Sequence, residues 1–135
     1  MFDLSLNNPL EVAEAGYEFA VELPDGTKTD FKIKVRGSMS KVVRDFQRKT
    51  FEEYQIKERM AKKRKQEVEE ESLDELEDRA VKNAIVRIIS WSGLADEGKE
   101  VKFTKEAAEK ILKEHYWIRT QVIDNSDDVS NFRRD

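Results

Sequence analysis

The middle of the sequence constrains the fold most, because no glycine or proline interrupts it between Gly37 and Gly93. Residues with good helix propensity fill this stretch, so it predicts either one long charged helix or a pair of helices with a joint between them. Within it, Lys57–Lys65 holds six basic residues and Glu67–Asp78 holds eight acidic ones. We expect the acidic run to be a solvated helix face, since no neighbouring apolar sequence would raise the pKa of its carboxylates.

The first half of this stretch predicts an amphipathic helix over residues 39–66. Its apolar positions follow the i, i+3, i+4, i+7 template: Met39, Val42, Val43 and Phe46. Beyond Thr50 the apolar residues no longer hold one narrow face, so the helix either bends there or uses two faces. Four of them are the candidates for a partner-binding surface, because they do not all fit one buried face: Phe51, Tyr54, Ile56 and Met60.

A β-hairpin is predicted over residues 17–36. Apolar and charged residues alternate with period two on both sides of Pro24-Asp25-Gly26, which is the pattern of two strands that share one apolar face. Gly26 supplies the positive φ that such a turn needs. The outward charges of the two strands are complementary: Glu18 and Glu22 against Lys32 and Lys34. The apolar face needs cover from the rest of the chain, because a lone hairpin is marginal in water.

The remaining sequence predicts a C-terminal helical region over residues 72–132. Ser72-Leu73-Asp74-Glu75 is a capping box, which indicates a new helix start. The most apolar stripe of the chain follows and predicts a central core helix: Leu73, Leu76, Ala80, Ala84, Ile88 and Trp91. Gly93 is expected to end this helix as its C′ residue. A turn at Asp96-Glu97-Gly98 and an N-cap at Thr104 would then lead into the last helices.

These elements predict an α+β fold, mostly α, in which the N-terminal hairpin packs on about four helices within a single domain over residues 1–135. Charged residues make up 40% of the chain and hydrophobic ones only 38%, so few residues are available for the core. Trp91, Phe103 and Trp117 could anchor a partner. The shortage of core residues favours their burial within the domain instead.

The composition also narrows the chemistry. The chain has no cysteine and one histidine, so disulfides, thiolate catalysis and cysteine-type metal sites are excluded. His115 has no second histidine or cysteine with which to share a metal ion. We expect no enzyme activity, catalytic residue, metal site or cofactor. No apolar run approaches the ~20 residues that span a membrane, and the N-terminus lacks a signal-peptide pattern. We therefore expect an intracellular protein without a membrane partner.

The basic run Lys57–Lys65 supports a second hypothesis. Six cations in nine residues are dense enough for phosphate contacts, even though the net charge of the chain is −4. The neighbouring acidic run would repel the same phosphates. A small nucleic-acid-binding or regulatory protein is therefore the alternative to a protein-binding role.

The C-terminal third carries a resemblance to a known family. Between about Ile85 and Phe132 the sequence follows a recurring order of short motifs: Trp91-x-Gly93, Asp96-x-Gly98, Phe103-Thr104, Ile111-Leu112, Trp117-Ile118 and Asn131-Phe132. This order resembles the tail assembly chaperones, a group of minor tail proteins of long-tailed bacteriophages. The N-terminal hairpin with its glycine turn is also similar to that family.

The resemblance implies a non-enzymatic chaperone of the short type. It would bind the phage tape measure protein and keep that protein's long hydrophobic helices soluble. A longer form made by programmed ribosomal frameshifting would recruit tail tube subunits. The resemblance places both forms in the host cytoplasm and outside the mature virion, and it leaves self-association open.

Overall fold

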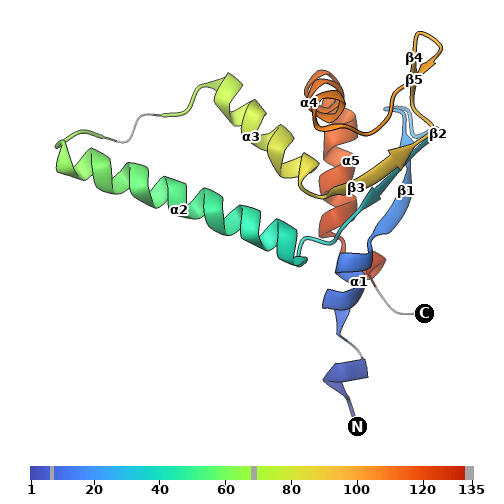
Figure 1. Ribbon diagram of the computed structural model, residues 1–135, viewed down its shortest axis with the longest axis horizontal. Coiled ribbons are helices and arrows are strands. Elements are labelled where there is room, and N and C mark those ends of the chain that lie inside the picture. Colours follow the sequence, from blue (N-terminus) through green and yellow to red (C-terminus); the bar gives the residue numbers. More distant parts are fainter. Residues whose placement is uncertain (7, 68–69, 133–135) are drawn as a thin grey trace.

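A computed structural model describes residues 1–6, 8–67 and 70–132 of the chain (Figure 1). In chain order its elements are η1 (Leu4–Leu6), α1 (Pro9–Ala15), β1 (Tyr17–Glu22), β2 (Lys28–Val35), α2 (Lys41–Lys63), α3 (Leu73–Ile85), β3 (Ile88–Ser92), β4 (Ala95–Asp96), β5 (Lys99–Glu100), α4 (Lys105–Glu114), α5 (Tyr116–Asp127) and η2 (Val129–Asn131). The predicted α+β, mostly α class is confirmed.

The predicted hairpin is confirmed as the antiparallel pair of β1 and β2. Gly26 adopts a φ of +91° in the turn, and the carboxylate of Asp25 accepts a hydrogen bond of 2.9 Å from the backbone N–H of Thr27. This contact holds the pKa of Asp25 below its usual value. The register places Glu18 opposite Lys34, so complementary charges face each other across the strands.

The expectation of one core helix from Leu73 to Trp91 is wrong. Helix α3 ends at Ile85, and Ile88–Ser92 forms β3, an antiparallel neighbour of β2 in the order β1-β2-β3. Strand β2 would otherwise leave an unpaired row of backbone groups, which β3 now satisfies. The side chain of Arg36 also donates a hydrogen bond of 2.5 Å to the carbonyl of Val86, and this contact holds the chain in its new direction.

Gly93 is therefore not a helix C′ residue. It follows β3 with a φ of +77°, and a Cβ at this position would lie 2.1 Å from the carbonyl oxygen of Asp30. Glycine is needed here because two backbones pass very close to each other. Gly98 has a φ of +78° in the tight turn between β4 and β5, which confirms the predicted turn.

The core lies on one face of the three-stranded sheet, and helices α3, α4 and α5 contribute to it. Its buried apolar residues come from the sheet (Phe19, Val21, Phe31, Ile33, Val35 and Ile88), from the helices (Ala13, Val81, Ala84, Ile111, Leu112, Ile118 and Val122) and from the C-terminal Phe132. The opposite face of the sheet carries polar residues such as Lys32 and Ser90. Such one-sided burial is typical of antiparallel sheets.

Candidate partner-binding site

Helix α2 and the N-terminal part of α3 form an arm that extends away from the sheet and the C-terminal helices, while the C-terminal part of α3 packs against α4 and α5 (Figure 1). Of the residues of α2, Val43 near its start is buried. The start of α2 is tied to α1, because the backbone N–H of Lys41 donates a hydrogen bond of 2.6 Å to the carboxylate of Glu14. An acidic group suits the positive end of a helix dipole. The predicted helix over residues 39–66 thus exists, with bounds at Lys41 and Lys63.

Local ion pairs support the first turns of α2. Lys41 Nζ lies 2.8 Å from the carboxylate of Asp45, which also lies 3.6 Å from the guanidinium of Arg48. The hydrogen bond from Lys41 holds the pKa of Asp45 below its usual value. These contacts are exposed and contribute little to stability. They join residues within the first turns of α2.

An apolar groove of about 500 Å³ lies between the two helices of the arm. Its lining comes from α2 (Phe46, Gln47, Thr50, Phe51 and Tyr54) and from α3 (Leu76, Arg79, Ala80 and Asn83). We call this the apolar groove. Its volume is in the range of ordinary ligand pockets, but its open position between two helices is better suited to the side chains of a docked helix.

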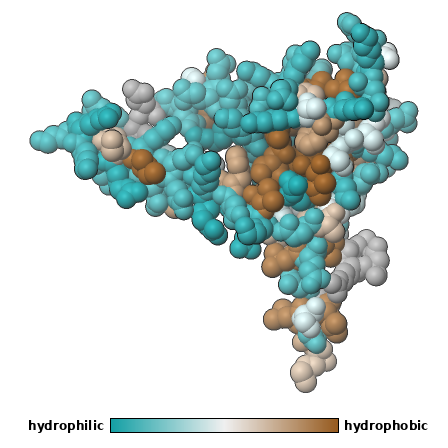
Figure 2. Space-filling view, in the orientation of Figure 1, coloured by the Kyte–Doolittle hydropathy of each residue, from teal (hydrophilic) through white to brown (hydrophobic). Residues whose placement is uncertain are grey.

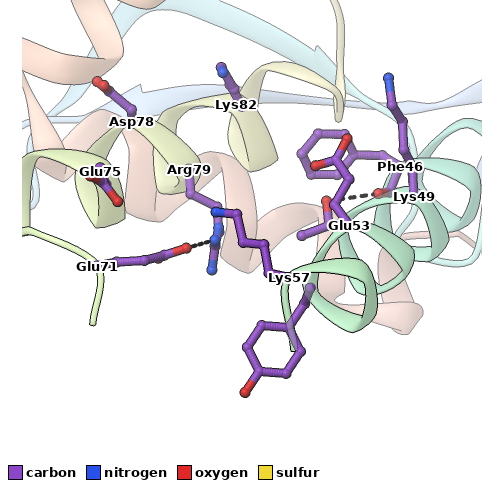
Figure 3. Close-up of a pocket in the computed structure, with 11 residues that line it drawn as sticks. Phe46, Lys49, Glu53, Lys57, Glu71, Glu75, Asp78, Arg79 and Lys82 are labelled. Atoms are coloured by element: carbon purple, nitrogen blue, oxygen red, sulfur yellow. Dashed lines mark hydrogen bonds and ion pairs between the residues drawn. The ribbon is translucent and has the colours of Figure 1, made fainter. Parts of the chain in front are cut away.

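A second depression of about 500 Å³ lies on the other side of the seam between α2 and α3, and we call it the charged groove. It shares Phe46, Thr50, Tyr54 and Arg79 with the apolar groove. Figure 3 shows Lys49, Glu53 and Lys57 approaching it from α2, with a row of charged residues on and just before α3 across from them. Arg79 forms an ion pair with Glu71 at this edge.

The structure separates the four predicted partner-binding residues into two pairs. Phe51 and Tyr54 line the apolar groove and are 60% and 51% exposed. Ile56 and Met60 are 53% and 44% exposed but line neither groove. The helix continues without a break past Thr50. It therefore presents apolar residues on two faces, which is one of the two outcomes expected from the sequence.

Sequence reasoning missed the α3 side of the groove. Leu73 and Leu76 were expected in the core, but they are 84% and 47% exposed. Helix α3 uses one face for the core, through Val81 and Ala84, and offers Leu76 and Ala80 to the groove. The signal was present in the sequence, since the apolar stripe of this helix is wider than a single buried face requires.

The sheet and the C-terminal helices α4 and α5 form the part of the fold that we call the body. The aromatic residues that the sequence singled out, Trp91, Phe103 and Trp117, pack within it. Trp91 is half-buried and makes edge-to-face contacts with Phe31 and Phe103, at centroid distances of 5.5 and 5.0 Å. Its indole N–H donates a hydrogen bond of 2.9 Å to the carbonyl of Val101. Trp117 also packs against the core cluster as a half-buried residue.

Three further motif residues take structural positions. Thr104 caps α4, because its hydroxyl accepts a hydrogen bond of 3.1 Å from the backbone N–H of Ala107, as predicted. Ile118 and Phe132 are buried in the core, where Phe132 contacts the ring of Tyr17 edge-to-face at 6.3 Å. Thr104, Ile118 and Phe132 therefore serve the structure of the fold, by capping a helix or filling the core.

The basic residues of the run Lys57–Lys65 are exposed. The one histidine, His115, is half-buried beside Trp117. Within residues 1–6, 8–67 and 70–132, no group of three or more histidine or acidic side chains could hold a metal ion. None of the helices in the same residues is both long enough and apolar enough to cross a membrane.

Comparison with known proteins adds one finding. The model of the family described as YdaY prophage protein matches residues 34–135. This segment includes the whole α2–α3 arm and everything that follows it, but not β1. No curated protein matches the chain, and no solved structure matches it. Because the matched segment covers most of the sequence, the chain belongs to the family of YdaY prophage proteins and is a phage-related protein.

Proposed function

We propose that this protein is a non-enzymatic chaperone of phage tail assembly, which binds the tape measure protein and keeps it soluble. One observation carries the proposal: the apolar groove exposes Phe51 and Tyr54 on an arm that extends away from the core. Large apolar side chains gathered at one exposed site are a feature of interaction surfaces. Membership of a prophage protein family is consistent with a role in virus assembly.

The groove favours an amphipathic helix as its ligand. Two helices with a gap between them can accept the apolar stripe of a third helix, whose side chains at i, i+3, i+4 and i+7 enter the groove. Charged residues surround the contact on both helices of the arm, including Lys49, Glu53 and Arg79. These charges would keep the complex in solution while the apolar stripe of the partner is covered. Binding of this kind needs no nucleotide.

The proposal extends to the longer form. A frameshifted product that carries an additional domain would recruit tail tube subunits, while the short form holds the tape measure protein. Both would act in the host cytoplasm and be absent from the finished virion.

Solubility of the partner tests the proposal. The tape measure protein encoded near this gene is expressed with and without the chain, and its soluble fraction is measured after centrifugation. The double variant Phe51→Ser/Tyr54→Ser should lower that fraction while the circular dichroism and thermal midpoint of the chain stay close to native. The matched control Leu23→Ser/Tyr116→Ser removes two exposed apolar residues outside the groove and should behave like the native protein.

Nucleic-acid binding remains the second candidate, because the cations of Lys57–Lys65 are exposed at the outer end of α2. A gel-shift assay with DNA and RNA over a range of salt concentrations distinguishes the two. If the tape measure protein stays insoluble with the native chain while nucleic acid is shifted in a salt-sensitive way, the chaperone proposal is wrong.

A further inference from the structure

Strand β1 forms one edge of the three-stranded sheet. In the part of the chain that the structure describes, no strand pairs with it on the side away from β2. This edge lies on the side of the molecule opposite to the arm (Figure 1), and Figure 2 shows mostly hydrophilic surface along that margin. An open strand edge presents backbone donors and acceptors that can pair with an added strand. The proposed binding of a helix in the apolar groove does not use this edge.

The side chain of Gln121 on α5 takes the place of a neighbouring strand at the last residue of β1. Its Nε2 donates a hydrogen bond of 2.8 Å to the carbonyl of Glu22, and its Oε1 accepts one of 2.8 Å from the N–H of the same residue. A residue of an antiparallel neighbour makes this same pair of contacts. The backbone of Glu22 therefore points outward, and Gln121 closes this end of the edge to an added strand.

The next outward backbone groups of β1 belong to Ala20 and Glu18. On the inner side, the hydroxyl of Thr29 on β2 donates a hydrogen bond of 2.7 Å to the carbonyl of Val21, so this carbonyl points toward β2. The direction of the backbone groups alternates from one residue to the next along a strand. The N–H and carbonyl groups of Glu18 and Ala20 therefore point outward, like those of Glu22. Within the described residues, no backbone group outside the sheet bonds to them.

A groove of about 510 Å³ lies between this edge and the polar residues of α5, and we call it the edge groove. Three exposed carboxylates line it: Glu18 and Glu22 from β1, and Asp124 from α5. One exposed cation, Lys28, lines it as well. The excess of negative charge favours a basic ligand. The backbone groups along one wall favour a ligand in an extended conformation.

A second copy of the chain is a poor occupant of this edge. Antiparallel pairing of two β1 strands centred on Ala20 would place Glu18 of each copy opposite Glu22 of the other. Like charges directly opposite each other destabilise a strand pair. The side chain of Gln121 would also have to leave the backbone of Glu22. A segment that carries cations avoids the repulsion between carboxylates.

We propose that the outer edge of β1 binds a short extended segment of a partner protein, with lysine or arginine at alternate positions. The segment adds a fourth strand to the sheet, bonds to the backbone of Glu18 and Ala20, and ends where Gln121 occupies Glu22. Its basic side chains lie on the polar face of the sheet, where Glu18 and Glu22 also lie. The side chains between them face Asp124 of α5. Backbone hydrogen bonds supply affinity in this mode of recognition, and the side chains supply specificity.

A synthetic peptide of alternating lysine and threonine tests the site. Hydrogen exchange of the isotope-labelled native chain is followed by NMR with and without the peptide. Saturating peptide should slow the exchange of the N–H groups of Glu18 and Ala20 at least about tenfold, because these groups become hydrogen-bonded. The N–H of Glu22 should change little, since it is already bonded to Gln121.

Two N-methylated peptides separate strand addition from simple charge attraction. A lysine opposite Glu18 points its N–H toward β1, so N-methylation of the lysines removes the donors and should weaken binding at least about tenfold. N-methylation of the threonines is the matched control. It leaves the same charges and the donors that face β1, and it should leave the affinity close to that of the unmodified peptide.

Variants of the chain test both walls of the argument. Glu18→Gln/Glu22→Gln should raise the dissociation constant at least about fivefold at low salt, whereas Asp96→Asn/Glu100→Gln removes two exposed carboxylates of the β4–β5 hairpin and should bind like the native chain. Ala20→Pro removes one outward N–H, a change that edge strands tolerate, and should abolish binding. Circular dichroism verifies that each variant is folded, and the N-methylated peptides give the same test on the native chain.

Four results overturn the proposal: a native chain that does not bind the peptide, binding that leaves the exchange of Glu18 and Ala20 unchanged, equal affinity for the two N-methylated peptides, or protection of these N–H groups without peptide as the protein concentration rises. The last result would show pairing between copies. The double variant Phe51→Ser/Tyr54→Ser should bind the peptide like the native chain. Failure of the edge groove and failure of the chaperone function are thereby distinguished.

Discussion

The side chain of Arg87 is 3% exposed, and its Nη1 donates a hydrogen bond of 2.5 Å to the carboxylate of Asp127. The same nitrogen lies 3.1 Å from the hydroxyl of Ser126, and Nε donates to the carbonyl of Asn83 at 3.2 Å. Ser126 in turn donates to the backbone carbonyl of Arg36 at 2.7 Å. One buried cation thus connects the end of α3, the end of α5 and the end of β2, close to the start of the arm.

We expect Asp127→Ala to lower the free energy of unfolding by about 1.5 kcal/mol, because the buried guanidinium of Arg87 loses its carboxylate partner. The value lies at the low end for a charged hydrogen bond, since the Asp127 side chain is half exposed. Asp124→Ala, one turn earlier on the same helix and exposed, is the control. Urea unfolding of both variants measures the difference, and equal losses would show that the Arg87 contact contributes nothing.

Gly93→Ala should destabilise the protein more than Gly98→Ala. The two glycines have nearly equal φ values, +77° and +78°, so the strain of a left-handed residue, about 1–2 kcal/mol, is common to both. The added Cβ meets the carbonyl of Asp30 at 2.1 Å in one case and no atom within 4 Å in the other. We expect an additional loss of about 1–3 kcal/mol for Gly93→Ala, as in overpacked cores. Denaturant midpoints that agree for the two variants would contradict this explanation.

Trp91 is the link between the sheet and the segment that leads into α4. Trp91→Ala should reduce stability by about 3 kcal/mol, because it removes the ring between Phe31 and Phe103. Trp91→Phe keeps much of the apolar contact and loses the hydrogen bond to Val101, so we expect about 1 kcal/mol. Thermal unfolding followed by circular dichroism measures both. Similar losses for the two variants would indicate that the indole N–H contact dominates.

The hairpin could be predicted from the sequence because its period-two alternation and its Pro24-Asp25-Gly26 turn indicate the same structure independently. Strand β3 could not be predicted from the sequence. Ile88 and Trp91 continue the helical spacing of α3, and a short apolar run fits a buried helix or a strand equally well. What decides the outcome is the open edge of β2 and the contact of Arg36 with the carbonyl of Val86. Both depend on residues about fifty positions away in the sequence.

The candidate site was predicted on one helix only. Phe51 and Tyr54 were identified because they fail to fit a buried face. Leu76 lies on the same apolar stripe as core residues of α3, so the sequence placed it in the core. It lines the groove instead, because this part of α3 extends beyond the body. The buried position of Arg87 had no local signal, because its partners come from α5 and from the preceding turn of α3.

Asp128 provides a pH-dependent contact at the C-terminal end of the described chain. Its carboxylate accepts hydrogen bonds from the hydroxyl and the backbone N–H of Ser130, at 2.6 and 3.0 Å, and these hold the pKa of Asp128 below its usual value. Because the pKa is lower in the folded state, the stabilisation is complete above the unfolded-state pKa and is lost as the pH falls through the folded-state pKa. We expect Ser130→Ala to raise the pKa of Asp128 in an NMR titration. An unchanged pKa would mean that the hydroxyl contact is absent in solution.

The α3 side of the apolar groove gives a test of the chaperone proposal that is independent of Phe51 and Tyr54. Leu76 lines the groove, whereas Leu73, three residues earlier on the same helix, is more exposed and lines neither groove. Leu76→Ser should therefore lower the soluble fraction of the co-expressed tape measure protein.

Leu73→Ser is the matched control and should leave that fraction unchanged, although it removes the same amount of apolar side chain from the same helix. Circular dichroism of both variants verifies that α3 remains folded. A helix that docks in the groove contacts Leu76 directly, so the two variants must differ if the groove is the binding site. If Leu73→Ser and Leu76→Ser reduce the solubility of the partner equally, the partner recognises the exposed apolar residues of the arm in general, and the groove is not the site.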